Sequence, residues 1–110
     1  MHLTITEAAL NRLYQEMNTD RQTYLQIYYD TEGCCGVNGV PTIRLRESKH
    51  ADDLSVTSEQ LSVIIHPQQA TFFEKEMTLD FNQQTFRLTS PQGILNGFIS
   101  PGELKKDVAV

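Results

Sequence analysis

The sequence has few cysteines, few basic residues and no long apolar run. Its two cysteines, Cys34 and Cys35, are adjacent, so they cannot cross-link distant segments, and a disulfide framework is excluded. Lys and Arg number 9 against 14 Asp and Glu, for a net charge of −5. Because nucleic-acid affinity depends largely on basic contacts to phosphate, we expect no nucleic-acid partner.

The apolar residues are spread in short segments along the whole chain. None approaches the roughly 18 to 20 residues that a membrane-spanning helix needs, and the first residues lack the charged-then-apolar layout of a signal peptide. We therefore expect no membrane association and a cytoplasmic location. A chain of 110 residues is long enough for one hydrophobic core. We expect a single domain over residues 1–100 and a mobile C-terminal tail over residues 101–110.

The first part of the chain predicts one helix followed by a strand. Thr6 can cap a helix, and Leu10, Leu13, Tyr14 and Met17 recur at helical spacing. We predict an amphipathic helix over residues 7–17. Residues 24–30 are rich in aromatic and β-branched side chains, which favours a strand.

Further along the chain, apolar and polar residues alternate in several short segments. They predict strands over residues 42–46, 54–56 and 61–66, and a hairpin of residues 77–81 and 86–88 around a turn at 82–84. Pro67 suits a first helical position, so a short helix through Phe73 is expected. The fold class predicted is α+β, with an N-terminal amphipathic helix and a second short helix.

The segment Gly33-Cys34-Cys35-Gly36 is the feature most suggestive of chemistry. Glycine on both sides lets backbone N–H groups point toward a thiolate or a bound anion, which favours a metal or cluster ligand. A glycine turn that merely carries two small residues explains the pattern equally well. Asp30 and Glu32 precede the thiols and disfavour thiolate by like charge, which counts against a metal-free nucleophile.

Several segments resemble the HesB/IscA family of A-type iron-sulfur assembly proteins. They are residues 3–9, 28–36, 77–81 and 90–91, and residues 30–42 are similar to a small core-domain branch found in Gram-positive bacteria. The resemblance implies a distorted β-barrel or two-sheet fold, iron or iron-sulfur cluster binding, and delivery of the cluster to apo-proteins. It also implies iron-sulfur assembly proteins as partners and an oligomeric state. The cysteine of the family's Gly-Cys-x-Gly turn falls on Cys34.

The chain departs from this family near its C-terminus. Well-studied members carry a Cys-Gly-Cys there, and the matching stretch Asn96-Gly97-Phe98-Ile99-Ser100 has no thiol. We therefore carry over Cys34 as a metal ligand and propose Cys35 as a substitute because it is adjacent, with Gly33 and Gly36 shaping the loop. Because an iron-sulfur cluster usually takes about four protein thiolates, one chain cannot complete the site alone.

Three hypotheses follow from these residues. The first is a non-enzymatic carrier of iron or an iron-sulfur cluster, bound at a subunit or partner interface. The second is a degenerate family member that keeps the fold and acts as an interaction module without metal. The third is a thiol redox or sulfur-transfer enzyme, which would require a reactive thiol of low pKa.

Overall fold

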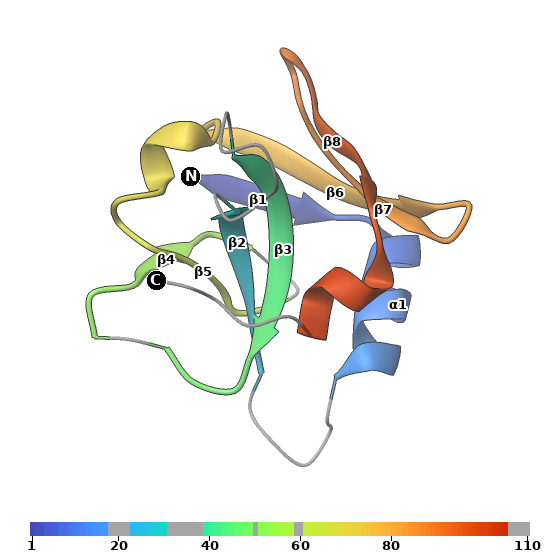
Figure 1. Cartoon of the computed structure of the whole chain (residues 1–110), viewed down its shortest axis with the longest axis horizontal. Helices are drawn as coiled ribbons and strands as arrows, with labels where there is room; N and C mark the ends of the chain where they lie inside the picture. The colour runs from blue at the N-terminus through green and yellow to red at the C-terminus, as the bar shows by residue number, and fades with distance from the viewer. Residues whose placement is uncertain (18–22, 31–38, 50, 59–60, 106–110) are drawn as a thin grey trace.

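Two four-stranded sheets and one α-helix make up the structure, a computed structural model that describes residues 1–17, 23–30, 39–49, 51–58 and 61–105. The first sheet has the order β1-β6-β7-β8 and the second the order β3-β2-β5-β4 (Figure 1). The α+β class is therefore confirmed. The first sheet contains β1 (His2–Ile5), β6 (Glu76–Asn82), β7 (Thr85–Ser90) and β8 (Gly93–Ile99). The second contains β2 (Tyr24–Asp30), β3 (Val40–Arg46), β4 (Leu54–Val56) and β5 (Val63–Ile65).

The strand pairing is mixed in both sheets. The pairs β1–β6 and β2–β5 are parallel, whereas β2–β3, β4–β5, β6–β7 and β7–β8 are antiparallel. A backbone bridge between His2 and Thr57, just after β4, joins the two sheets at one side. On another side, the Asn96 amide of β8 donates a hydrogen bond of 2.7 Å to the carbonyl of Pro41 in β3. The sheets are thus connected at two places.

The helix α1 (Glu7–Glu16) begins directly after Thr6. The Thr6 hydroxyl accepts from the Ala9 N–H at 3.3 Å and donates to Asp80 Oδ1 of β6 at 2.7 Å. The same residue therefore caps the helix and ties it to the first sheet, because α1 packs against β6 (Figure 1). Ala9 and Leu13 of the helix are buried in the core.

The hydrophobic core draws on α1, both sheets and the end of the described chain. Its fully buried side chains include Leu13, Leu25, Ile27, Leu79, Phe86, Leu88 and Leu104. The strand β2 is buried on both faces. Gln26 and Tyr28 on one face are as inaccessible to solvent as the core residues Leu25 and Ile27 on the other. No helix among the described residues is long and apolar enough to cross a membrane.

The second helix differs from the expectation. Instead of an α-helix from Pro67 through Phe73, the chain forms a turn followed by one 3-10 turn, η1 (Ala70–Phe72). The side chain of Gln69, immediately before η1, does not cap it, because its amide bonds to the backbone of β2. The Gln69 side chain thus bonds β2 and leaves the first turn of η1 without a side-chain cap.

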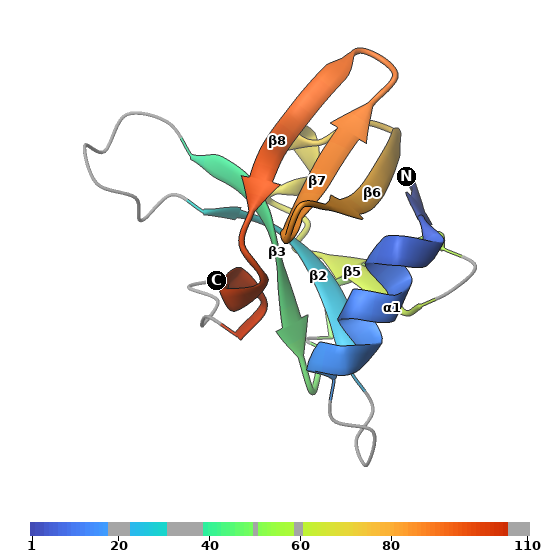
Figure 2. The same cartoon turned by 90° about the vertical axis from the view of Figure 1, so that its right-hand side faces the viewer.

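The C-terminal part of the chain is more regular than the sequence suggests. Residues 93–99 form β8, a strand that the apolar pattern did not predict, and the β7–β8 hairpin projects from the molecule (Figure 2). A mobile tail was expected over residues 101–110. Instead, the first five of these residues form the 3-10 helix η2 (Pro101–Lys105), in which Leu104 is fully buried. Burial of this one leucine anchors η2 against the core. Residues 106–110 lie outside the described residues.

Candidate functional site

The predicted metal ligands belong to residues 31–38, the cysteine segment, which joins β2 to β3. Cys34 and Cys35, with Gly33 and Gly36, lie in residues 31–38, outside the described residues. The structure describes both ends of this segment, where Asp30 and Val40 form the last pair of the antiparallel β2–β3 ladder. The site is therefore described by what holds these two ends in place.

Gln69 holds the end of β2 from one side. Its Oε1 accepts from the Tyr29 N–H at 2.9 Å, and its Nε2 donates to the Tyr29 carbonyl at 3.0 Å. The neighbouring strand β5 pairs with β2 only as far as Ile27. Gln69, which is 6 % exposed, thus supplies with a side chain the two hydrogen bonds that a longer β5 would supply with its backbone.

The ring of Tyr29 packs over the other end of the segment. It stacks on Phe72 of η1 with centroids 4.1 Å apart, and it meets Phe73 edge-on at 6.4 Å. A Cβ atom at Gly39 would overlap this ring. Glycine at position 39 therefore allows the chain to leave the cysteine segment directly against Tyr29.

Arg44 holds Asp30, the last residue of β2. Its Nη2 lies 3.2 Å from Oδ2 of Asp30, and its Nη1 lies 2.8 Å from Oε2 of Glu103 in η2. The guanidinium also lies over the Tyr28 ring, 5.0 Å from its centroid, and Nη1 donates to the Thr42 hydroxyl at 3.2 Å. Arg44 thus pairs with two carboxylates, one of which is Asp30, the residue that directly precedes the cysteine segment.

Strand β8 approaches the same region from the first sheet. Asn96 donates to the Pro41 carbonyl and accepts from the Phe98 N–H at 3.0 Å, so both ends of its amide are occupied. A pocket of about 180 Å³ lies here, with Asp30, Val40, Thr42, Asn96, Phe98, Ile99 and Glu103 around it. Phe98 is 83 % exposed, and Ile94 and Val40 are exposed as well. The surface beside the cysteine segment is therefore partly apolar.

Comparison with known proteins matches this arrangement to one family. A sequence model of that family, described as iron-sulphur cluster biosynthesis, matches residues 1–102. The chain belongs to the iron-sulphur cluster biosynthesis family. The resemblance to HesB/IscA proteins is thereby confirmed.

Individual known proteins are similar to this chain in sequence or in fold. YqkB of Bacillus subtilis, an uncharacterized protein, is 34 % identical over 99 residues, which are 87 % of this chain and 92 % of YqkB. The crystal structure of a candidate Fe-S biosynthesis protein from Lactobacillus salivarius has a TM-score of 0.73 at 19 % identity and covers 91 % of this chain and 95 % of that one. IscA with a [2Fe-2S] cluster has a TM-score of 0.56 at 16 % identity, over 89 % of this chain and 98 % of IscA. At these identities the two structures establish the fold.

The donor atoms of the described residues limit where this protein could bind a metal ion. Within the ranges that the structure describes, no group of three or more His, Cys, Asp or Glu side chains could hold a metal ion. Asn96 and Phe98 of β8 offer an amide already engaged in two hydrogen bonds and a phenyl ring. The two thiols of the cysteine segment thus remain the predicted ligands.

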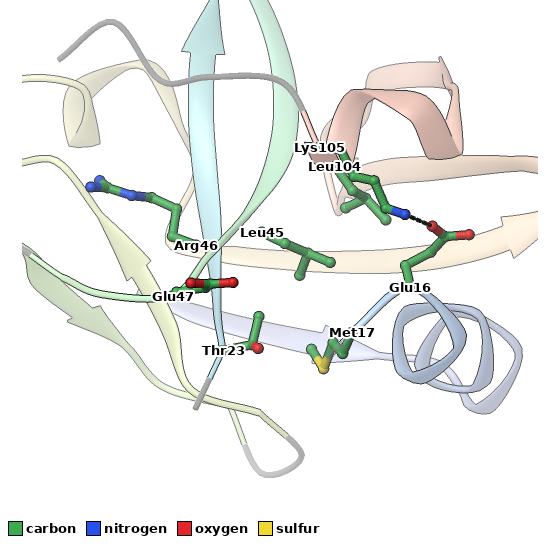
Figure 3. Close-up of a pocket in the computed structure, with 8 residues that line it drawn as sticks. All are labelled: Glu16, Met17, Thr23, Leu45, Arg46, Glu47, Leu104 and Lys105. Atoms are coloured by element: carbon green, nitrogen blue, oxygen red, sulfur yellow. Dashed lines mark ion pairs between the residues drawn. The ribbon is translucent and has the colours of Figure 1, made fainter. Parts of the chain in front are cut away.

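Another pocket lies at the opposite end of the β2–β3 ladder. It has a volume of about 350 Å³ and is lined by Glu16, Met17, Thr23, Leu45, Arg46, Glu47, Leu104 and Lys105 (Figure 3). Lys105 and Glu16 form an ion pair of 3.4 Å across it. Because this pocket adjoins the first residues of β2, it is at the end of the strand away from the cysteine segment.

The sequence reasoning missed three residues of the site: Gln69, Arg44 and Asn96. Arg44 alternates with apolar Ile43 and Leu45, which is the usual pattern of a solvent-facing charge, and yet it is 1 % exposed. Its partners are 14 and 59 residues away, and those of Gln69 and Asn96 are 40 and 55 residues away. A local pattern contains no signal for such contacts.

Proposed function

We propose that this protein is a non-enzymatic carrier that binds iron or an iron-sulfur cluster through Cys34 and Cys35 and passes it to apo-proteins in the cytoplasm. The proposal is supported by the contacts that hold the two ends of the cysteine segment. Gln69 next to η1, Arg44 of β3 and Asn96 of β8 hold the ends of the two strands between which Cys34 and Cys35 lie.

The number of thiols favours transfer over permanent binding. A cluster usually takes about four protein thiolates, and each chain offers two. The remaining ligands would come from a second copy, a partner protein of the assembly machinery or a small thiol. A site completed by an exchangeable ligand is labile, and this lability suits a protein that must release its cargo.

Anaerobic reconstitution with iron and sulfide tests this proposal. We expect thiolate-to-iron absorption bands and bound iron in the natural protein, and neither in the double variant Cys34→Ser/Cys35→Ser. The single variants separate the two thiols, since Cys34 matches the family motif and Cys35 is proposed only from its adjacency. Equal iron binding by the natural protein and the double variant would exclude the proposal.

A second candidate function is an interaction module that works without metal. It is favoured by the exposed side chains of Val40, Ile94 and Phe98 and by the absence of thiols in the stretch 96–98. In that case the metal-free double cysteine variant would still bind purified iron-sulfur assembly proteins as tightly as the natural protein does. A tightly held, stoichiometric cluster would exclude this alternative.

A further inference from the structure

Strands β3 and β8 meet beside η2, where the pocket of about 180 Å³ lies (Figure 2). Two of the residues around it are acidic, Asp30 at the end of β2 and Glu103 in η2, and none of those that the structure describes there is basic. Arg44 pairs with both carboxylates, but its side chain is 2 % exposed, whereas each carboxylate is about one quarter exposed. The pocket therefore presents two carboxylates to the solvent and keeps the arginine buried.

The chemistry of these carboxylates favours a positively charged ligand. Arg44 supplies one positive charge to the two negative charges of Asp30 and Glu103. An ionised carboxylate has about four acceptor positions, so it can accept a hydrogen bond from a ligand besides those that it already accepts. Because both groups are partly shielded from water, an ion pair here is screened less than one on an open surface. The pocket is thus suited to a further cation.

Apolar side chains flank the two carboxylates. The Phe98 ring of β8 is 83 % exposed, and Val40 of β3 is about half exposed, and both lie around the pocket. A guanidinium stacks on aromatic rings and donates several hydrogen bonds in one plane, so it matches a ring beside carboxylates better than an ammonium does. A free small cation would leave Phe98 and Val40 in water, whereas a protein surface would cover them. The patch is therefore suited to an arginine that is carried by a protein.

We propose that this pocket, with Val40 and Phe98 at its rim, is a docking surface for a partner protein that inserts an arginine side chain toward Asp30 and Glu103. Sites for whole small molecules usually have volumes of about 300–1,000 Å³, so a pocket of about 180 Å³ suits a single side chain. A second copy of this chain is a less favourable partner, because each copy has a net charge of −5 and the copies repel each other. The inference goes beyond the carrier function, since it requires no metal.

An NMR titration of the full-length, metal-free protein tests this docking surface. The probe is an acetylated and amidated tripeptide of leucine, arginine and leucine, and its control has neutral citrulline in place of arginine. A third ligand, methylguanidinium, has the cation without the apolar neighbours. The amides of Thr42, Asn96 and Ile99, which lie around the pocket, report binding. We expect the arginine peptide to bind about 5- to 20-fold more tightly than either of the other two ligands.

Two variants of the pocket, each with a matched control, locate the binding. Glu103→Gln removes one carboxylate, and its control Glu47→Gln removes an exposed carboxylate just after the other end of β3. Phe98→Ala removes the exposed ring, and its control Tyr14→Ala removes a half-exposed ring on α1. We expect Glu103→Gln and Phe98→Ala each to weaken binding of the arginine peptide about 3- to 10-fold, and the controls to change it less than about twofold. Since the Phe98 ring is mostly in solvent, its removal tests the surface without disturbing the core.

Several results would overturn the proposal. Equal binding of the arginine and citrulline peptides, or binding of neither, would exclude a role for the cation. Binding of methylguanidinium as tight as that of the arginine peptide would show that the apolar rim contributes nothing to docking. Sedimentation equilibrium tests the other occupant: a dimer that Phe98→Ala dissociates would assign the surface to a second copy of this chain. Because no metal is added, these results do not depend on whether Cys34 and Cys35 bind iron, so failure of this proposal and failure of the carrier function are distinguishable.

Discussion

The two hydrogen bonds from the Gln69 side chain to Tyr29 provide the sharpest test of how the cysteine segment is held. Gln69→Leu removes both bonds and keeps a side chain of similar size. The neighbouring residue Gln68 is exposed, so Gln68→Leu is the matched control. The comparison separates the loss of the two bonds from the general effect of replacing glutamine with leucine.

The size of the effect follows from what Tyr29 loses. Its N–H and its carbonyl each lose a partner at about 3 Å. A lost hydrogen bond costs about 1 kcal/mol where water can replace it and about 1–3 kcal/mol where the group stays buried. Tyr29 is half-buried, so we expect a total of about 2–4 kcal/mol. For a domain of this size that corresponds to a fall in Tm of about 10–20 °C.

Thermal unfolding followed by circular dichroism measures the global effect, and amide hydrogen exchange measures the local one. In Gln69→Leu the exchange of the Tyr29 amide should rise more than that of the buried β2 amides further from the segment. Gln68→Leu should leave both quantities close to those of the natural protein. If Gln69→Leu unfolds within about 2 °C of the Gln68→Leu control, the two hydrogen bonds contribute little and the reasoning is refuted.

Three further predictions concern the rest of the fold. Thr6→Ala should cost about 1–2 kcal/mol at neutral pH, measured by urea unfolding, whereas Thr6→Ser should retain most of the stability. The hydrogen bond from the Thr6 hydroxyl, and to a lesser extent that from the Phe81 N–H, lowers the pKa of Asp80 below its ordinary value of 3.8. The ionised Asp80 therefore stabilises the fold above pH 3.8, and this stabilisation is lost as the pH falls through the lowered pKa. The difference between Thr6→Ala and the natural protein should therefore shrink below about pH 4, and a constant difference would contradict this assignment. Gln84→Gly should raise stability by about 0.5–1 kcal/mol, because Gln84 has a φ of +68° in a two-residue hairpin turn that favours glycine there, and a loss of stability would refute it. Gly39→Ala should lower stability by about 1–3 kcal/mol by displacing the Tyr29 ring, and an unchanged Tm would show that the ring moves freely.

The elements with a strong local pattern could be predicted from the sequence. Thr6 and the helical spacing after it predicted α1, and the aromatic and β-branched content of residues 24–30 predicted β2 with the observed bounds. The hairpin turn was predicted from Asn82-Gln83-Gln84, and the structure has Asn82 paired with Thr85 around two residues of positive φ. In each case the residues that determine the element lie within the element or next to it.

The parts that were not predicted depend on contacts between distant segments. Strand β8 has two register shifts against β7, so its apolar residues do not alternate, and Ile94 and Phe98 point their apolar side chains to the surface. Helix η2 has one buried residue, Leu104, among polar neighbours. The supports of the cysteine segment likewise join residues 14 to 55 positions apart. The cysteine pair itself was recognised from its glycines and from the family resemblance.

Iron bound per chain after anaerobic reconstitution tests the central claim most directly. The measurement compares the natural protein with Cys34→Ser/Cys35→Ser at matched thermal stability, with iron and sulfide counted after removal of unbound metal. The carrier proposal expects bound iron with thiolate-to-iron absorption in the natural protein and the loss of both in the double variant. Iron binding that survives the double substitution, or no iron in either protein, would contradict it.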